Sequence, residues 1–439
     1  MKTLLQRIEA GEALVGVIGL GYVGLPLARA FWSRGNRVVG FDVDAEKVAV
    51  LNRGGSYLDS IPAAMIADVT DRGLFRATDD FSALAEVDAI LICVPTPLTR
   101  QREPDMTFID QTTETIARHL RAGQLVVLES TTYPGTTAER VVPRLERTGL
   151  RAGKDFFVAF SPEREDPGNR HFNTQTIPKV VGADDEASLT LARALYERAI
   201  DRVVGVSSLA TAEAVKLTEN IFRSVNIALV NELKVIYSAM GIDVWEVIEA
   251  AKTKPFGFMP FYPGPGLGGH CIPIDPFYLT WKARELDITT RFIELAGEIN
   301  TQMPGWVVDR LAEAMDRRGR PVSGSRILVV GIAYKKNIAD DRESPAYKLM
   351  ALLDKKGATV SYHDPHVPEI HPGRHYPQFG GLRSVPLDPE TVAAHDAVLI
   401  CTDHDGIDYG SLVAHARLVV DTRNATRTVE GGRDRIVRA

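Results

Sequence analysis

Leu14-Val-Gly-Val-Ile-Gly19-Leu-Gly21-Tyr22-Val23-Gly24 is the stretch of sequence that decides the fold. An apolar run that leads directly into three closely spaced glycines predicts a strand, a tight turn and the start of a helix. The glycines permit the turn, let the backbone approach a pyrophosphate and allow close packing of helix on strand. The N-terminus of that helix would face the phosphates. The pattern therefore predicts a dinucleotide site formed by Gly19, Gly21, Tyr22, Val23 and Gly24.

The next apolar run, Arg37-Val-Val-Gly-Phe-Asp42, ends in an acid at the spacing of a ribose-binding carboxylate. Asp42 is expected to accept the adenosine 2′-hydroxyl and to repel a 2′-phosphate, and Asp44 adds to that repulsion. The expected cofactor is therefore NAD and not NADP. If the glycine motif were accidental, the two acids would be solvated turn residues.

Outward from this motif, short β-rich runs alternate with helical sequence up to about Gly205, as in a doubly wound α/β sheet. Most of the runs are continuously apolar, so their strands should be covered on both faces and largely parallel. The runs are 14–19, 37–42, 88–94, 125–130, 156–161 and 179–182.

A long amphipathic helix is predicted for residues 210–240, which contain neither glycine nor proline. We interpret it as a spine between two α/β domains, with surplus apolar surface that forms a dimer contact; the alternative is an internal helix buried by its own chain. Its apolar residues recur at steps of three and four, at Leu217, Ile221, Val225, Leu229, Leu233 and Ile236.

Strand-like runs return in the last part of the chain, and the first two again end in Gly and Asp. Gly331-Ile-Ala-Tyr-Lys-Lys replaces the full glycine fingerprint, so this domain should be a degenerate fold for a different nucleotide. The expected fold is α/β, with two doubly wound Rossmann-like domains joined by a long central helix. The predicted parts are 1–205 (NAD-binding), 206–319 (central, with a cysteine loop) and 320–439 (C-terminal), and the runs of the last are 326–331, 359–364, 397–402 and 418–421.

Composition excludes several classes of protein. The 439 residues carry a net charge of -6 and no long basic run, which disfavours nucleic acid and anionic membranes as partners. No segment is long and apolar enough for a membrane span, and the start of the chain lacks a secretory h-region. Three cysteines make no disulfide framework. We expect a cytoplasmic protein without a metal site.

Cys271 differs from the other two cysteines. Cys93 and Cys401 lie in apolar runs and are expected to be core, whereas Cys271 lies in a loop rich in glycine and proline where a thiol has little packing to do. A thiolate there could attack an aldehyde, and the resulting thiohemiacetal could lose hydride to become a thioester that water hydrolyses. Asp275 could then move protons or orient the water. This chemistry predicts oxidation of an alcohol to an acid.

Small polar residues follow successive predicted strands at Thr96, Thr131 and Glu163. Because ligands bind beyond the carboxyl ends of parallel strands, we expect these three residues to line the nicotinamide side of one crevice. On the long helix, Lys216 and Asn220 share one face among apolar neighbours, and such a lysine can stabilise a developing oxyanion.

With these residues in place, the chain resembles the UDP-glucose/GDP-mannose dehydrogenase family over nearly its whole length. The resemblance rests on six motifs in order, which begin at Gly19, Ser130 (Ser-Thr-Thr-Tyr-Pro-Gly-Thr), Ser161 (Ser-Pro-Glu-Arg), Glu213 (Glu-Ala-Val-Lys-Leu-Thr-Glu-Asn), Gly268 (Gly-Gly-His-Cys-Ile-Pro-Ile-Asp) and Lys335. It implies a four-electron oxidation at C6 of a nucleotide sugar with two NAD, a C-terminal domain that holds the nucleotide diphosphate, and a homodimer or higher homo-oligomer formed through the central helix.

The resemblance also implies residue roles. Cys271 matches the nucleophile, Lys216 and Asn220 the oxyanion and water-positioning pair, Asp275 the acid of the cysteine loop, and Thr131 and Glu163 the water-handling residues. Arg342 matches an arginine that reaches NAD, so the expected cofactor contacts are Gly19, Gly21, Tyr22, Val23, Gly24, Asp42, Thr96, Thr131 and Arg342. The expected substrate contacts are Glu163, Arg164, Lys216, Asn220, Gly268 and Lys335.

Ser161-Pro-Glu-Arg and Cys271-Ile-Pro-Ile-Asp depart from the branch of the family that oxidises UDP-glucose. They resemble the branch that acts on UDP-N-acetylhexosamines, and most closely the enzymes for UDP-N-acetylglucosamine. UDP-N-acetylmannosamine and UDP-glucose remain alternative substrates. Two further readings are a two-electron hydroxy-acid dehydrogenase, in which Cys271 would be dispensable, and a nucleotide-binding regulator without catalysis.

Overall fold

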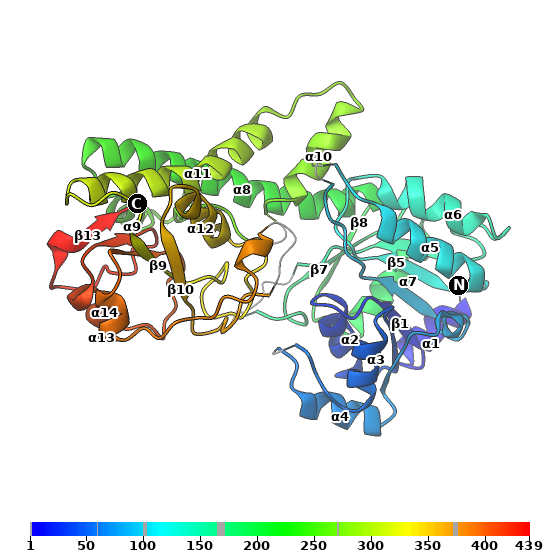
Figure 1. Cartoon of the computed structure of the whole chain (residues 1–439). Coiled ribbons are helices and arrows are strands. Elements are labelled where there is room, and N and C mark those ends of the chain that lie inside the picture. The colour runs from blue at the N-terminus through cyan, green and yellow to red at the C-terminus, as the bar shows by residue number, and fades with distance from the viewer. Residues whose placement is uncertain (1, 59, 100–102, 165–171, 270–271, 372–375) are drawn as a thin grey trace. The chain divides into compact units, whose positions relative to one another are not determined.

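The computed structural model describes residues 2–58, 60–99, 103–164, 172–269, 272–371 and 376–439 (Figure 1). The chain forms two compact units. Unit 1 comprises Met1–Glu219 and Phe277–Thr289, and unit 2 comprises Asn220–Pro276 and Thr290–Ala439. The three-part division at residues 206 and 320 stays a prediction. Within the described ranges, no helix combines the length and apolar character needed to cross a membrane.

Unit 1 is built on an eight-stranded sheet of order β3-β2-β1-β4-β5-β6-β7-β8. Neighbouring strands pair in parallel except β6 and β7, so the last two strands run against the other six. The strands are β1 (Val15–Ile18), β2 (Val38–Phe41), β3 (Phe75–Thr78), β4 (Ala89–Ile92), β5 (Leu125–Leu128), β6 (Phe157–Phe160), β7 (Lys179–Gly182) and β8 (Val203–Val206).

All six predicted strands of unit 1 are present, and the two that the sequence pattern missed, β3 and β8, are the two edges of the sheet. Arg76 in β3 points to solvent, and β8 has no buried residue. Edge strands need no continuous apolar run, because one side of each is not covered by a neighbour.

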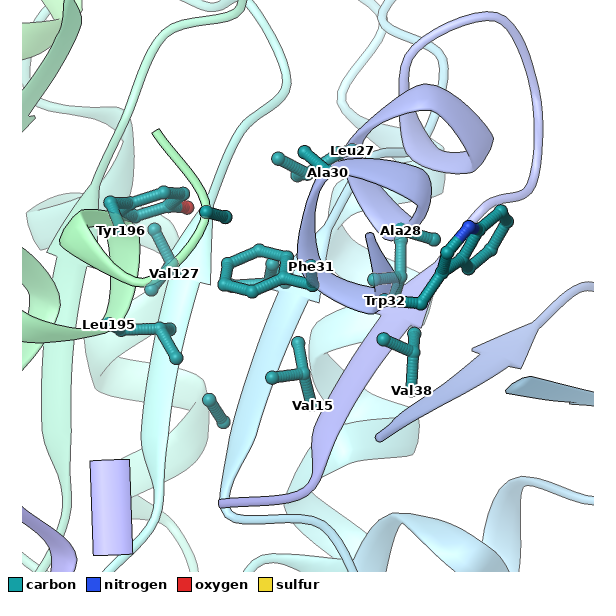
Figure 2. Close-up of a cluster of buried hydrophobic side chains, with 14 of the residues drawn as sticks. Val15, Leu27, Ala28, Ala30, Phe31, Trp32, Val38, Val127, Leu195 and Tyr196 are labelled. Carbon is teal, nitrogen blue, oxygen red and sulfur yellow. The ribbon is translucent and has the colours of Figure 1, made fainter. Parts of the chain in front are cut away.

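Helices pack on both faces of this sheet. Figure 2 shows Phe31 of α2 pointing toward Val15, Leu195 and Tyr196, and its ring centroid lies 6.1 Å from that of Tyr196. The helices of unit 1 are α1 (Lys2–Glu9), α2 (Gly24–Trp32), α3 (Ala45–Asn52), α4 (Ala63–Asp71), α5 (Thr107–His119), α6 (Val142–Glu146), α7 (Glu186–Glu197) and most of α10 (Asp275–Arg284), with short turns η1 (Phe81–Ala85) and η2 (Thr137–Val141).

The long helix is present as α8 (Leu209–Met240), 32 residues that begin in unit 1 and continue into unit 2. Leu217 is buried, but Leu229 and Ile236 are exposed by 50% and 45%. The predicted apolar face therefore covers its own chain over only part of its length.

Unit 2 contains a second, fully parallel sheet of order β10-β9-β11-β12-β13, which confirms two doubly wound domains joined by a long helix. Its strands are β9 (Arg326–Val330), β10 (Thr359–His363), β11 (Ala397–Ile400), β12 (Val419–Asp421) and β13 (Ile436–Arg438), of which only the three-residue β13 was not predicted. Its further helices are α9 (Val244–Ala251), α11 (Arg291–Asp316), α12 (Pro345–Lys355), α13 (Pro389–Ala393) and α14 (Tyr409–His415), with turns η3 (Pro377–Phe379) and η4 (Arg433–Arg435).

Candidate functional site

The glycine loop between β1 and α2 has the shape that a pyrophosphate requires. Gly19 has φ +90°, and a Cβ there would lie 2.5 Å from the carbonyl oxygen of Cys93. A Cβ on Gly24 would lie 1.9 Å from the carbonyl oxygen of Gly19, so helix and strand pack too closely for any side chain. A Cβ on Gly21 would meet nothing within 4 Å. Gly21 thus leaves bare backbone toward open space at the helix N-terminus, which fits a dinucleotide.

Asp42 ends β2 and is buried beside this loop. One carboxylate oxygen accepts from the backbone N–H of Leu20 at 2.9 Å, and the other accepts from Asp44 at 3.0 Å. Asp44 caps α3 by accepting from the N–H groups of Glu46 and Lys47. Asp42 therefore holds the loop, while its contact with a ribose stays a prediction, and Asp44 has a structural role that its spacing did not reveal.

Thr96, Thr131 and Glu163 follow β4, β5 and β6, which are adjacent in the sheet of unit 1. The structure therefore places these predicted residues at three successive strand ends on one edge. The loops are tied together, because Ser130 Oγ donates to the carbonyl oxygen of Val94 at 2.7 Å. Their contacts with a ligand stay a prediction.

Helix α10 packs on the same loops within unit 1. Tyr278 is fully buried and its hydroxyl donates to the carbonyl oxygen of Thr96 at 2.6 Å. The ring of Trp281 lies 4.9 Å from that of Tyr133, and Lys282 Nζ lies 5.0 Å from the Tyr133 centroid. Sequence reasoning missed Tyr133 and Tyr278, although both are aromatic residues within or beside quoted motifs.

The loop after β5 is also held by Glu213 of α8. Its carboxylate accepts from the N–H of Gly135 at 2.5 Å, and from both the N–H and the hydroxyl of Thr137 at 2.8 and 2.6 Å. Burial raises the pKa of Glu213 to about 7, against the effect of these hydrogen bonds.

Lys216 is buried in unit 1, and Asn220, four residues later on α8, is fully buried in unit 2. The Asn220 side-chain amide donates to a carboxylate oxygen of Asp275 at 2.5 Å, and Arg223 donates to the Asn220 side-chain oxygen Oδ1 at 3.2 Å. The structure thus joins two of the predicted catalytic residues. Cys271 lies outside the described residues.

Arg164 is engaged by unit 1 itself. It donates to the carbonyl oxygen of Pro178 at 2.6 Å and pairs with Glu219 at 2.6 Å. Its contact with substrate stays a prediction.

In unit 2, the cysteine loop touches the segment that follows β9. A Cβ on Gly268 would lie 2.8 Å from side-chain atoms of Tyr334 and Pro345, so Gly268 packs directly against the residue before Lys335. Arg342 lies in the same segment and forms a two-bond pair with Asp340 at 2.9 and 2.6 Å. Gly268 and Lys335 therefore come from neighbouring segments, while the expected approach of Arg342 to NAD stays a prediction.

A buried lysine and a half-buried arginine flank Gly264 at the start of the cysteine loop, and the sequence analysis missed both. Lys234 Nζ donates to the Gly264 carbonyl oxygen at 3.2 Å and lies 4.9 Å from the Trp306 ring centroid. A Cβ on Gly264 would lie 2.4 Å from the guanidinium of Arg423, whose Nε donates to Cys401. Burial and the charge of Arg423 lower the pKa of Lys234 to about 7.

Asn231 fixes the other side of Gly264. Its side-chain oxygen accepts from the Gly264 N–H at 3.0 Å, and its amide donates to Asn300 at 2.9 Å. Asn300 in turn donates to the Ser224 carbonyl oxygen. The start of the cysteine loop is therefore clamped to α8 through both backbone groups of one glycine.

The degenerate dinucleotide position of the second sheet is closed by its own chain. Asp364 follows β10 as Asp42 follows β2, and it accepts from the N–H groups of Ile332 and Ala333 at 2.7 and 2.9 Å. His404 Nε2 donates to the same carboxylate at 3.0 Å. Burial opposes the charge of Asp364, but these donors lower its pKa.

Three stretches of the chain match domains of one family. Residues 13–200 match the NAD binding domain of the UDP-glucose/GDP-mannose dehydrogenase family, residues 210–302 its central domain and residues 328–428 its UDP binding domain. Together they include every predicted site residue.

Individual relatives are similar over nearly their full lengths. A UDP-N-acetyl-D-glucosamine 6-dehydrogenase of Pseudomonas aeruginosa is 36% identical over 89% of this chain and 90% of its own. A UDP-N-acetyl-D-mannosamine dehydrogenase of Pyrococcus horikoshii is 35% identical over 93% and 95%. A solved structure of the UDP-D-ManNAc dehydrogenase from Pyrococcus horikoshii has a TM-score of 0.84 at 34% identity and covers 94% of this chain and 96% of that one.

Proposed function

Because this chain belongs to the UDP-glucose/GDP-mannose dehydrogenase family, we propose that it oxidises the C6 hydroxymethyl group of UDP-N-acetylglucosamine to a carboxylate. The chain has an NAD binding domain and a UDP binding domain, and its relatives are nucleotide-sugar dehydrogenases. The proposal adds the acetamido sugar, the residues and the route.

The buried hydrogen bond between Asn220 and Asp275 carries the proposal. It joins the long helix to the first residue of α10, four positions after Cys271. A carboxylate and an amide held in this way can orient water and pass protons beside a thioester.

In the proposed route, C6 is oxidised twice, and NAD held by the Gly19–Gly24 loop and Asp42 would supply the hydride acceptor, with one NAD consumed in each oxidation. The Cys271 thiolate adds to the C6 aldehyde formed by the first, and Lys216 stabilises the oxyanion of the thiohemiacetal. The second oxidation leaves a thioester. Water held by Glu163, Asn220 and Asp275 then attacks the thioester carbonyl, and the uronic acid leaves as Cys271 recovers its proton.

The C-terminal domain would hold the nucleotide diphosphate. We assign two cations as contacts of the diphosphate: Arg423 of that domain and Lys234 of α8. Burial, and after it the repulsion between Lys234 and Arg423 beside one glycine, lowers the pKa of Lys234. A diphosphate would relieve this repulsion, because an anion stabilises the charged forms of both side chains.

The test is a count of NADH released per sugar across UDP-N-acetylglucosamine, UDP-N-acetylmannosamine and UDP-glucose. We expect two NADH per UDP-N-acetylglucosamine and faster turnover than with the other two. One NADH per sugar, or no turnover of any acetamido sugar, contradicts the proposal. UDP-N-acetylmannosamine is the second candidate, because the Pyrococcus horikoshii relative is almost as similar.

The variant Cys271→Ala separates the chemistries. We expect it to lose acid formation, whereas full activity would favour a hydroxy-acid dehydrogenase in which the thiol is dispensable. We further propose that the enzyme works in the cytoplasm as a homodimer or higher homo-oligomer, with exposed apolar residues of α8 in the interface.

A further inference from the structure

A charged cluster lies buried beneath the strand ends of unit 1, on the side of Glu163. Glu129 follows β5 and its side chain is fully buried, while Lys179 begins β7 and its side chain is 5% exposed. Lys179 Nζ lies 2.6 Å from one carboxylate oxygen of Glu129. The hydroxyl of Tyr196, on α7, donates to the other.

Lys179 also reaches toward Glu163. Its Nζ lies 3.7 Å from Glu163 Oε2, and the Glu163 side chain is 13% exposed. The lysine therefore stands between a fully buried carboxylate and a partly exposed one. The other titratable groups near Glu163 include the Cys93 thiol after β4, while the adjacent Arg164 is paired with Glu219.

Fold stability alone does not account for this cluster. A buried ion pair costs much of its attraction in desolvation, and apolar residues of similar volume often serve as well or better. Burial raises the pKa of Glu129, and although burial opposes the charge of Lys179, the two carboxylates raise its pKa. The buried Lys179 charge lies at the edge of the sheet where ligands bind, which indicates a role in the functional site.

We infer that Lys179 is a positioning residue that holds the Glu163 carboxylate oriented for hydrolysis of the thioester, while Glu129 and Tyr196 hold Lys179 in place. The inference rests on the proposed function, because it gives Glu163 the water in that step. Lys179 touches no substrate in this assignment. It acts through its charge on the carboxylate that does.

Two variants should move the acidic limb of the kcat–pH profile in opposite directions. Glu129→Gln removes the negative charge that offsets Lys179, so Glu163 faces an uncompensated cation and the limb should move about one unit to lower pH. The double variant Glu129→Gln/Lys179→Met removes the cation too and leaves no unpaired buried charge, so the limb should move to higher pH. Both variants contain Glu129→Gln. Lys179→Met alone is avoided, because it would leave the buried Glu129 carboxylate without its cation and could prevent folding.

The matched control is Asp88→Asn. Asp88 is another buried, ion-paired carboxylate of unit 1, held by Arg7 and Arg121, but it precedes β4 and so lies at the opposite edge of the sheet. The acidic limb of the kcat–pH profile of Asp88→Asn should lie at the same pH as that of the native enzyme. Limbs that coincide in all variants, or that move together in one direction, would overturn the inference.

An unmoved acidic limb in these variants differs from a failure of the proposed function. The NADH count of the unmodified enzyme decides whether an acid is formed at all, and it does not depend on Lys179. Two NADH per sugar with an unmoved limb would remove only the role of Lys179.

Discussion

Asn220 donates its side-chain amide to Asp275 at 2.5 Å, and both side chains are buried within unit 2. The bond links α8 to the start of α10 across 55 residues of sequence. Changing either residue breaks a buried hydrogen bond to a carboxylate, and hydrogen bonds to charged groups contribute about 1.5–3 kcal/mol.

Asp275→Asn tests whether this bond serves catalysis. The variant has nearly the same volume but cannot accept a proton, so we expect turnover to fall about 100-fold or more with a modest change in KM. Steady-state kinetics and a thermal melt would separate lost chemistry from lost fold.

The control is Asn226→Ala, which removes a partly exposed asparagine of the same helix whose side-chain amide donates to the Phe222 carbonyl oxygen. It should retain activity. Equal activity of Asp275→Asn and the native enzyme would rule out a proton-transfer role for Asp275.

The glycine loop gives a pair of matched substitutions. Gly24→Ala forces a Cβ to within 1.9 Å of the Gly19 carbonyl oxygen, so we expect a loss of several kcal/mol of stability before any cofactor is added. Gly21→Ala meets no protein atom within 4 Å, so its melting temperature without NAD should match that of the native chain.

NAD binding then distinguishes the two roles. The added methyl of Gly21→Ala would stand where the pyrophosphate approaches, and we expect NAD affinity to fall at least tenfold by calorimetry. An unchanged affinity would mean that the dinucleotide does not pass over Gly21.

The exposed apolar side chains of α8 predict an interface. Phe222, Leu229 and Ile236 follow one another at seven-residue steps, two turns apart, and Met240 extends the stripe; all four are exposed by at least 45%. Such a stripe on a long helix suits a second copy of the chain. Leu229→Glu/Ile236→Glu should convert the oligomer to a monomer by light scattering.

An exposed phenylalanine elsewhere serves as the control for this change. Phe108 lies on α5 in unit 1 and is 43% exposed, so Phe108→Glu should leave the mass unchanged. If the native chain is already monomeric at micromolar concentration, the predicted interface on α8 is wrong.

Much of this architecture could be predicted because each decisive feature is local. The central strands are continuous apolar runs, and the Gly19–Gly24 spacing and the long helix are visible within one window of sequence. Edge strands and α10 were harder, because β3 contains the exposed Arg76, β8 is only a short Val-Val-Gly-Val run with no buried residue, and the contact of Tyr278 with Thr96 spans 182 residues.

One missed signal was present in the sequence. Polar residues recur along α8 at helical spacing, and each is buried, so they form a polar stripe that an amphipathic reading overlooks. The sequence analysis singled out Lys216 and Asn220 from this stripe. It missed Asn231 and Lys234, which bind Gly264. The full stripe is Glu213, Lys216, Asn220, Ser224, Asn231 and Lys234.

Lys234 at the end of that stripe makes stability depend on pH. Its pKa is about 7 in the folded chain and 10.5 when unfolded, so between these values the unfolded chain binds the proton that the folded chain lacks. Stability contributed at this site should therefore rise with pH from about 7 to 10.5, by up to about 5 kcal/mol. Lys234→Met should abolish this rise, and its difference from the native chain should shrink as pH increases.

Urea unfolding at pH 6.5, 8 and 9.5 would measure that difference directly. Below pH 7 the folded chain holds a buried ammonium beside Arg423, so Lys234→Met should gain most there, less the cost of the hydrogen bond to Gly264. Lys355→Met, an exposed lysine at the end of α12, is the matched control and should follow the native chain at every pH. Parallel stability curves for Lys234→Met and Lys355→Met would mean that the Lys234 ammonium keeps its proton in the folded chain up to alkaline pH, as it does when unfolded.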